Sequence, residues 1–458
     1  MKERKFLNFI LSKFTILGLQ LLAMAIFLFF IYKLNILPMK TIILVTGALV
    51  VLWLIYVGII YSGQKKEKEK HFSKRVTITK VFSIITSIVL LLGTRYVVRG
   101  DNFINNVSNK TTETHVVSVR VLKDSVTDSV EALSGKPTAV SYQHDSKNVA
   151  EAIASFEGEM TQDFDLQQKD TYVELADALY ANEVDAIIIG SEYVGMLEDK
   201  YESFKDETVE IASYKIEKEV EQTTTPTNVT DETFTVYLTG IDTYGDVSEV
   251  SRSDVNLLIT VNPKTKQVLM ISIPRDTEVT LSSYNAMDKL THSGMYGTSE
   301  TIETIEDFLE TDINYYAKTN FTGMRDIVDQ LGGITIDSPY EDFVTLHGDY
   351  TITKGINEMD GDKALCFVRE RYRLPNGDFD RGKNQQMVLK AMLEKVMSPK
   401  IITNFSSLLS AIEGTFETNM GDEEIRSLLN MQINDMSSWD IFSVQVSGTG
   451  YETTKTYS

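Results

Sequence analysis

Three long runs of apolar residues open the chain, and each has the length of a membrane-spanning helix. They cover Phe14–Tyr32, Thr41–Tyr61 and Val76–Val98, and about 20 apolar residues are needed to cross the hydrocarbon core of a bilayer. The third run contains Lys80 and Arg95, whose long side chains can reach the polar interface. We expect three spans. The alternatives are a signal peptide for the first run and a buried soluble helix for the third.

A small unit of mixed strands and helices is predicted after the apolar runs. The polar segment between them, Asp101–Thr114, indicates a tether. Alternating or continuous apolar residues predict strands at His115–Val121, Thr138–Tyr142 and Ala186–Gly190. Apolar residues at helical spacing predict helices within 149–156 and 173–179. The pattern predicts a small α/β accessory domain at 115–220 that holds no catalytic constellation, and its simplest interpretation is a spacer. A Thr-rich linker follows at 221–233.

A second and larger unit is predicted from residue 234 to residue 458. Its strand patterns lie at Phe234–Ile241, at a hairpin of Asn256–Val261 and Val268–Ile273, and at Ile334–Ile336. Its helical patterns lie at 302–309, at Phe321–Leu331 before the Gly332-Gly333 stop, and after Asp380. Because strands and helices interleave, we predict an α/β fold with a mixed sheet and helices on both faces. The three apolar runs form a separate segment, residues 1–99.

The charge of the chain is divided between its two ends. Residues 1–99 hold 15 Lys and Arg against 3 Asp and Glu, whereas the remainder holds 29 against 62. Basic residues flank the first run on its N-terminal side and fill 65–75, so both segments are predicted to be cytoplasmic. With three spans, everything after Arg99 then lies outside the cell. An acidic domain of this size repels nucleic acid, and divalent cations are more suitable partners.

The cysteine and histidine content adds two exclusions. Cys366 is the only cysteine, so the chain forms no intrachain disulfide, which is common for an exported bacterial protein. The five histidines are scattered and show no zinc-binding spacing; they are His71, His115, His144, His292 and His347.

A cluster of arginines lies between Ala364 and Gln386. If this segment begins as a strand, Arg369, Arg371 and Arg373 share one face. Arg381 and Gln385 are four residues apart at the start of a helical pattern, so they share a helix face. Several planar guanidinium groups beside a helix N-terminus suit a phosphate or a pyrophosphate. The alternative is a solvated strand face.

Acidic residues are predicted to converge with arginines at one end of the larger sheet. Asp242 follows the first strand, Asp254 precedes the second, and Arg275 and Asp276 follow the third. If these strands are antiparallel, all four residues lie at the same sheet end. Two carboxylates with phosphate oxygens suit Mg²⁺, although each aspartate has an ordinary turn or capping role as its alternative. The other ambiguous residues are Lys289 and His292, which face either the site or solvent, Asp380, which can cap a helix, and Cys366 and Phe367, which are expected in a core strand.

These residues resemble the LytR–CpsA–Psr family of bacterial cell-envelope proteins, over about Phe234 to Val396. The matching motifs are Leu238–Asp242, Arg252–Asp254, Ile271–Asp276, Asp360–Leu365, Val368–Arg371 and Asp380–Gln386. Three spans with an extra extracytoplasmic domain resemble the CpsA branch found with streptococcal capsule loci. One departure is the end of the chain, Tyr451–Ser458, which has no obvious terminal helix.

The resemblance implies a phosphotransferase in the cell membrane of a Gram-positive bacterium. It would move a glycopolymer, such as capsule or teichoic acid, from a polyprenyl-pyrophosphate carrier to peptidoglycan with the help of Mg²⁺. Asp242 and Asp254 would hold the metal. The pyrophosphate would be bound by Arg252, Arg275, Arg369, Arg371, Arg381 and Gln385. Asp254, Arg275, Arg369 and Arg371 would also act in catalysis, and the general base stays open between Asp254 and Asp276.

Two other functions are kept as alternatives. The first is hydrolysis of the same polyprenyl pyrophosphate, with water in place of the peptidoglycan hydroxyl. The second is a non-enzymatic, lipid-binding regulator of capsule assembly, in which the accessory domain is the active part. An assay with and without peptidoglycan separates transfer from hydrolysis, and an arginine substitution separates either enzyme from the regulator.

Overall fold

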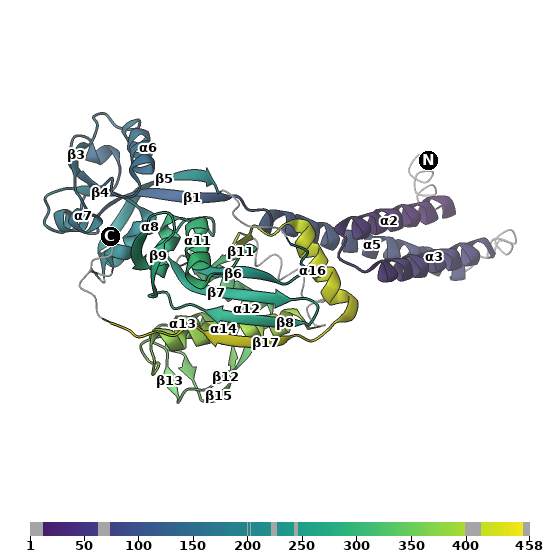
Figure 1. The fold of residues 1–458 in the computed structure, drawn as a ribbon. Helices are drawn as coiled ribbons and strands as arrows, with labels where there is room; N and C mark the ends of the chain where they lie inside the picture. The colour runs from purple at the N-terminus through teal and green to yellow at the C-terminus, as the bar shows by residue number, and fades with distance from the viewer. Residues whose placement is uncertain are drawn as a thin grey trace.

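Three long helices form the N-terminal part of the chain. The computed structural model describes residues 12–62, 74–198, 200–201, 203–220, 227–241, 246–398 and 414–451. Helices α2 (Lys13–Leu34), α3 (Met39–Ser62) and α5 (Lys74–Val107) coincide with the three apolar runs. All three are long and apolar enough to cross a membrane by length and composition (Figure 1). The three predicted spans are therefore helical, and a short non-helical connection, residues 35–38, joins the first two.

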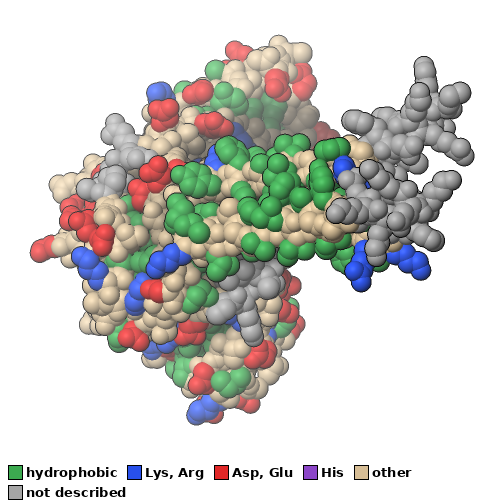
Figure 2. All heavy atoms as spheres, turned by 90° about the vertical axis from the view of Figure 1, so that its right-hand side faces the viewer, with side chains coloured by type: hydrophobic (Ala, Val, Ile, Leu, Met, Phe, Trp, Pro, Cys, Tyr) green, Lys and Arg blue, Asp and Glu red, His purple; other side chains and the backbone are tan. Residues whose placement is uncertain are grey.

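Apolar side chains cover the outside of these helices, whereas a polar contact between α2 and α5 is buried. Figure 2 shows hydrophobic side chains gathered along the stem formed by α2, α3 and α5. On α5, Val89 and Leu92 are more than half exposed, which does not suit a helix buried in a soluble protein. Between helices, Ser83 Oγ donates to Gln20 Oε1 at 2.6 Å. An apolar exterior around a hydrogen-bonded interior suits a lipid environment.

The predicted tether at Asp101–Thr114 is wrong. Helix α5 continues to Val107, and strand β1 begins at Thr112. Asp101 accepts hydrogen bonds from Lys33 and from Arg426 of helix α16 (Asp422–Asp435). The polar residues that indicated a tether therefore face partners far away in the sequence, which a local pattern does not reveal.

A five-stranded sheet with helices on both faces forms the small-sheet region, residues 112–219. Its strand order is β3-β2-β4-β1-β5, and β4 pairs with β1 antiparallel and with β2 parallel. Its strands are β1 (Thr112–Leu122), β2 (Pro137–Val140), β3 (Asp165–Gln168), β4 (Ala186–Gly190) and β5 (Thr208–Glu219). Its helices are η1 (Glu131–Leu133), α6 (Ser146–Glu157), α7 (Tyr172–Tyr180), α8 (Ser191–Leu197) and α9 (Phe204–Glu207).

Strand β4 explains why this sheet is covered on both sides. All five of its residues are buried, as its unbroken apolar sequence predicts for a central strand. Ile188 packs with α6 on one face, and Ile187 and Ile189 pack with α7 and α8 on the other. The strand thus joins two hydrophobic layers.

A six-stranded mixed sheet forms the centre of the large-sheet region, residues 234–445. Its order is β16-β11-β6-β7-β8-β17, with parallel pairs β6/β11 and β8/β17 and antiparallel pairs elsewhere. The strands are β6 (Phe234–Ile241), β7 (Ser253–Asn262), β8 (Gln267–Ser272), β11 (Tyr315–Asn320), β16 (Phe416–Thr418) and β17 (Asp440–Gln445). The mixed α/β class is confirmed.

Helices cover both faces of this sheet. Helix α11 (Thr298–Leu309) packs Ile302 and Ile305 with Tyr237 and Leu258. From α14 (Asp378–Val396), Gln386 Nε2 donates to carbonyl oxygens of β8 and β17. The other helices described between β8 and α14 are α10 (Leu290–Ser293), η2 (Gly294–Tyr296), α12 (Phe321–Gln330) and α13 (Gly361–Arg369). The described residues of the region also form three two-stranded sheets: β9 (Glu278–Leu281) with β10 (Ala286–Lys289), β12 (Ile334–Ser338) with β15 (Gly355–Met359), and β13 (Phe343–Val344) with β14 (Thr351–Ile352).

The segment before Arg371 is a helix, α13, and the predicted strand is wrong. The Asp360 side chain caps this helix by accepting from the backbone N–H of Lys363 at 2.9 Å. Ala364 and Phe367, three residues apart, are fully buried on its inner face. Phe367 is thus a core residue, but a helical one. Capping and a period of three to four residues outweigh the short alternation of charge that indicated a strand.

Candidate functional site

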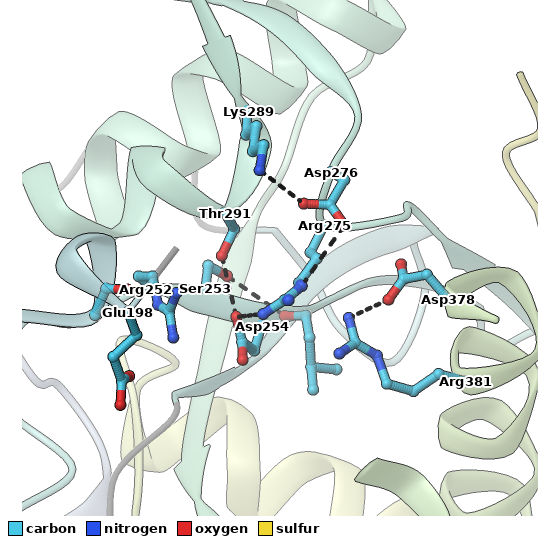
Figure 3. A network of polar contacts seen from close by, with 12 residues as sticks. Glu198, Arg252, Ser253, Asp254, Arg275, Asp276, Lys289, Thr291, Asp378 and Arg381 are labelled. Atoms are coloured by element: carbon cyan, nitrogen blue, oxygen red, sulfur yellow. Dashed lines mark hydrogen bonds and ion pairs between the residues drawn. The ribbon is translucent and has the colours of Figure 1, made fainter. Parts of the chain in front are cut away.

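Two of the predicted site residues meet at one end of the large sheet. Strand β6 ends at Ile241, which lies opposite Ser253 at the start of β7, and β8 returns antiparallel to the same end. There Arg275 Nη1 donates to Asp254 Oδ1 at 2.9 Å, and Thr291 Oγ1 donates to the same oxygen at 3.1 Å (Figure 3). The predicted convergence of Asp254 and Arg275 is therefore correct. Asp242 lies outside the described residues.

A cavity of about 560 Å³ opens beside this pair. Segments far apart in the sequence contribute to its wall. The sequence-predicted residues that line it are Arg252, Asp254, Arg275, Arg369, Arg371, Arg381 and Gln385. Every described residue that was predicted to bind the pyrophosphate thus faces one cavity, and five of these residues are arginines.

The arginines determine the charge state of Asp254. Burial alone raises the pKa of this carboxyl, but the charges of Arg275, Arg252 and Arg381 outweigh burial and leave the pKa below its ordinary value. Burial opposes the charge of Arg275 as well, yet Asp254 raises the pKa of that guanidinium on balance. The pair is therefore a stable ion pair, and Asp254 stays an anion.

Arg381 lies deep in the cavity wall, at the first turn of α14. Its side chain is 9% exposed, and Nη2 lies 2.5 Å from Asp378 Oδ1. Burial lowers its pKa, as do the neighbouring charges of Arg275 and Arg371, whereas Asp378 raises it. The cavity therefore concentrates the charge of five arginines, which Asp254, Asp378 and Glu198 neutralise only in part. A bound anion would relieve the remaining repulsion.

Arg369 and Arg371 reach the cavity by a different route from the one predicted. Arg369 ends α13, and its guanidinium lies 4.3 Å from the centre of the Phe321 ring. Arg371 follows in a loop and lines the cavity with Tyr372. Arg373 is exposed and is not among the described residues of the lining. The predicted row of three arginines is therefore reduced to two, because a loop does not alternate its side chains as a strand does.

Four of the ambiguous residues lie beside the cavity but do not line it. Asp276 Oδ1 lies 3.5 Å from Lys289 Nζ. His292 is buried, and its Nδ1 lies 2.7 Å from Asp288 Oδ1. Asp380 accepts from the backbone N–H of Asn376 and from Lys383 Nζ, so it fixes the turn before α14. These contacts give structural roles to residues whose function the sequence left open.

The sequence did not indicate several residues of the wall. Among the described residues these are Glu198, Val255, Phe321, His347, Val368 and Tyr372. Glu198 follows α8 of the small-sheet region. In the same helix, the carbonyl oxygen of Gly195 accepts from Arg252 Nη1 at 3.0 Å. A Cβ on Gly195 would lie 2.7 Å from Arg252 Nε, so glycine permits this close approach. The small-sheet region is therefore part of the cavity wall.

The chemistry of the wall can accommodate a hard cation beside the arginines. The hydrogen bonds to Asp254 from described residues engage Oδ1, and Figure 3 shows the second oxygen directed away from Arg275 and Thr291. A carboxylate oxygen of this kind suits Mg²⁺. Ile241, which directly precedes Asp242, is paired with the residue next to Asp254.

Comparisons with known proteins agree with these motifs. The model of the LytR_cpsA_psr family matches residues 199–458. A second model, described as DNA polymerase processivity factor, matches residues 70–189, which is less than half of the chain. The polyisoprenyl-teichoic acid–peptidoglycan teichoic acid transferase TagU of Enterococcus faecalis is 34% identical over 200 residues, covering 43% of this chain and 65% of the relative. The protein of the same name from Bacillus subtilis is 36% identical over 188 residues, covering 41% and 60%.

A solved structure is similar as well. The crystal structure of Bacillus subtilis TagU covers 48% of this chain and 87% of that one, with 33% identity and a TM-score of 0.39. The chain spans less than two thirds of the length of the two curated relatives named above. The family model, in contrast, covers more than half of the chain itself, including every described residue of the cavity wall except Glu198. The chain belongs to the LytR_cpsA_psr family.

Proposed function

We propose that this chain is a membrane-anchored phosphotransferase that moves a glycopolymer from a polyprenyl-pyrophosphate carrier to peptidoglycan. The observation that carries this proposal is the convergence of five arginines and Gln385 on one cavity in a strongly acidic part of the chain. Planar guanidinium groups bind phosphate oxygens in pairs and tolerate partial burial. The names of the relatives, which specify teichoic acid transfer to peptidoglycan, support the same substrate class.

The predicted orientation of the helices in the membrane supports an extracellular site. The basic residues at the N-terminus and at 65–75 favour the cytoplasm, and three helices of spanning length follow from residue 13 to residue 107. The cavity then faces the compartment that contains peptidoglycan. No ATP is needed there, because the donor pyrophosphate carries the free energy of transfer.

The reaction that fits this cavity is a displacement at phosphorus. A hydroxyl oxygen of peptidoglycan attacks the phosphorus that bears the glycan, and the bond from that phosphorus to the bridging oxygen breaks. Polyprenyl phosphate leaves with the electron pair, and the hydroxyl proton passes to a base. Arg275, Arg369, Arg371 and Arg381 would orient the pyrophosphate and stabilise the charge that develops on its oxygens. Among described carboxylates, Asp254 and Glu198 line the cavity and Asp276 does not, which favours the first two as the base.

Mg²⁺ is the cofactor we propose, with Asp242 and Asp254 as its ligands. When bound, the ion would withdraw negative charge from the phosphate oxygens. The lowered pKa of Asp254 keeps its carboxylate available at neutral pH. We expect Asp254→Asn to reduce transfer strongly and to remove its dependence on added Mg²⁺, with an unchanged circular dichroism spectrum. Full activity of this variant in the presence of a chelator would contradict the assignment.

The test of the function compares two arginines of the same loop. Arg371 lines the cavity, whereas the exposed Arg373 does not. We expect Arg371→Ala to lose roughly 2–4 kcal/mol of transition-state stabilisation, which corresponds to a rate about 30- to 1000-fold lower. Arg373→Ala should retain the wild-type rate. Arg371→Lys should recover only part of the loss, because lysine keeps the charge without the planar fork.

The assay uses purified full-length protein in detergent, lipid-linked glycan donor, and peptidoglycan fragments. Transfer predicts glycan attached to peptidoglycan and polyprenyl phosphate released in equal amounts. Equal release of polyprenyl phosphate with and without peptidoglycan would identify a hydrolase instead. Equal effects of the Arg371 and Arg373 substitutions would remove the cavity from the mechanism.

A further inference from the structure

A second cluster of potential ligands lies in the small-sheet region, away from the arginine cavity. His115 comes from β1, Asp145 from the residue before α6, and Glu192 from the first turn of α8. One ligand atom from each residue lies within 4.8 Å of the other two. His115 Nδ1 and Glu192 Oε1 are 3.4 Å apart, and two ligands of a tetrahedral zinc ion lie roughly 3.3 Å apart. The three residues thus approach the spacing of a metal site.

Two carboxylate oxygens of this cluster have no hydrogen-bond partner among the described residues. They are Oε2 of Glu192 and Oδ2 of Asp145, and both are buried. The side chain of Glu192 is only 1% exposed. Asp145 occupies the N-cap position of α6, but its side chain makes no capping hydrogen bond. Because a buried, unpaired carboxylate oxygen is costly, the two oxygens point to a missing positive partner.

The cluster lies where the two sheet regions meet. A cavity of about 350 Å³ borders His115, Asp145 and Glu192 on one side and Tyr296 and Gly297 on the other. Beside it, Glu113 of β1 accepts from the backbone N–H of Thr298 in α11 at 2.8 Å. An ion bound here would therefore join β1, α6 and α8 next to the contact with the large-sheet region.

We propose that His115, Asp145 and Glu192 bind a divalent transition-metal ion, with Zn²⁺ as the best fit, at the junction of the two regions. One imidazole and two carboxylates suit Zn²⁺ better than Mg²⁺, which prefers oxygen ligands and keeps most of its water. The three ligands are separated by 30 and 47 residues, so no short motif marks the site. This explains why the scattered histidines indicated no zinc site.

The proposed ion would influence the arginine cavity through α8. Glu192 lies at the start of this helix. Three residues later the carbonyl oxygen of Gly195 holds Arg252, and Glu198 lines the cavity just after the helix. The helix thus connects the two sites over less than two turns. Its position, and with it one wall of the cavity, would depend on the ion.

The test uses untagged full-length protein in detergent, stripped of metal with a chelator and titrated with ZnCl₂ in a calorimeter. The wild type should bind one Zn²⁺ per chain at this site. Glu192→Gln and His115→Gln should each weaken that binding more than about 100-fold. Loss of a residue that only orients a metal ligand costs about 10- to 100-fold in affinity, and loss of the ligand itself should cost more. Glu159→Gln, which changes an exposed glutamate of the same region, is the matched control and should bind Zn²⁺ as the wild type does.

Asp254→Asn separates this site from the proposed Mg²⁺ site. Zn²⁺ binding that persists in Asp254→Asn but is lost in Glu192→Gln supports the junction site, whatever the outcome for transfer activity. Zn²⁺ should also raise the unfolding temperature of wild type and Asp254→Asn, but not that of Glu192→Gln, since only a ligand bound to the folded state stabilises it. Unchanged binding in both ligand variants, or no binding by the wild type, would overturn the proposal. The circular dichroism of metal-free Glu192→Gln confirms that the variant is folded.

Discussion

The carboxylate of Glu370 organises the loop that presents Arg371. Its Oε1 accepts from the backbone N–H groups of Arg371, Tyr372 and Arg373, at 2.9, 2.9 and 3.1 Å, and its Oε2 accepts from Leu346 at 2.7 Å. The residue is 2% exposed. A buried carboxylate that accepts four backbone hydrogen bonds fixes the loop strongly. Arg371 is thereby directed to the cavity while Arg373 stays in solvent.

Glu370→Gln should lower both stability and transfer activity. The amide presents an NH₂ group where one carboxylate oxygen accepted hydrogen bonds, so at least one backbone donor loses its partner. A loss of roughly 3 kcal/mol in the free energy of unfolding is expected from hydrogen bonds to a charged group. Chemical unfolding followed by tryptophan fluorescence measures it. A variant as stable as the wild type would show that the loop does not depend on this carboxylate.

Individual site residues were predictable where a local period fixed them. Arg381 and Gln385 share a helix face, and Asp254 and Arg275 share a sheet end; both predictions needed only the spacing within or between neighbouring elements. Arg369 and Arg371 do line the cavity, but not because they alternate on a strand. On a strand, Glu370 would face away from Arg369 and Arg371; in the structure it fixes the loop that presents Arg371. No local sequence pattern indicates that Arg371 would line the cavity from a loop, or that Glu370 would fix that loop.

At the scale of elements, the pairing of β16 with β11 places a glutamate in a buried position. Glu417 lies opposite Lys318, with Nζ and Oε1 3.8 Å apart and both side chains 3% exposed. Burial raises the pKa of Glu417 to about 7, against the charge of Lys318 and together with that of Glu113. The folded state therefore holds this proton at pH values where the unfolded state has released it.

The ionisation of Glu417 should consequently lower the free energy of unfolding as pH rises from about 4.5 to about 7. Since the folded pKa lies above the unfolded one, the proton stabilises the folded state at low pH, and the loss is on the order of 3 kcal/mol. Glu417→Gln should remove this part of the pH dependence and be more stable than the wild type at pH 8. Unfolding measured at pH 5 and pH 8 for both proteins checks it. Parallel changes in the two proteins would refute the prediction.

The elements themselves were largely predictable, and the two errors have different causes. The three apolar helices, strand β4, the β7–β8 hairpin and helix α14 follow from hydrophobic periods that are long or unbroken. The tether was wrong because polar residues there have partners from distant segments. The strand before Arg371 was wrong because the Asp360 cap and a helical period outweigh a short alternation of charge. The assignment of Glu198 to the cavity wall had no signal in the sequence, since it depends on how two sheet regions pack.

At the scale of the whole molecule, Arg426 joins the large-sheet region to the membrane helices. From α16 it donates to the carbonyl oxygen of Leu34, to Asp101 and to Asn105, at 2.7, 2.8 and 3.1 Å. The residue is 6% exposed. One side chain thus contacts the ends of α2 and α5 together, close to where both leave the predicted membrane region (Figure 1). This contact limits how the cavity can move relative to the bilayer.

Arg426→Ala should weaken that connection without altering the cavity. Removal of one partner from a buried ion pair costs roughly 3–5 kcal/mol, so the two parts should move more independently. Transfer from a long-chain polyprenyl donor in vesicles should fall, while transfer from a short-chain donor in detergent should stay close to the wild type. Arg325→Ala, which changes a half-buried arginine of α12 that pairs with the nearby Asp326 and Asp362, is the control. Equal loss with both donors would mean that the substitution damages the cavity itself.

The unbroken course of α5 has a geometric consequence. The helix contains 34 residues and is therefore about 51 Å long, well beyond the roughly 30 Å of a hydrocarbon core. Each residue added to or removed from a rigid helix turns everything beyond it by about 100° and moves it by about 1.5 Å. The number of residues in α5 thus encodes both the altitude of the arginine cavity above the lipid and its azimuth around the stem. Removing two whole turns, about seven residues, would bring the cavity nearer to the bilayer yet leave its azimuth almost unchanged, whereas removing two residues would turn it toward the opposite side.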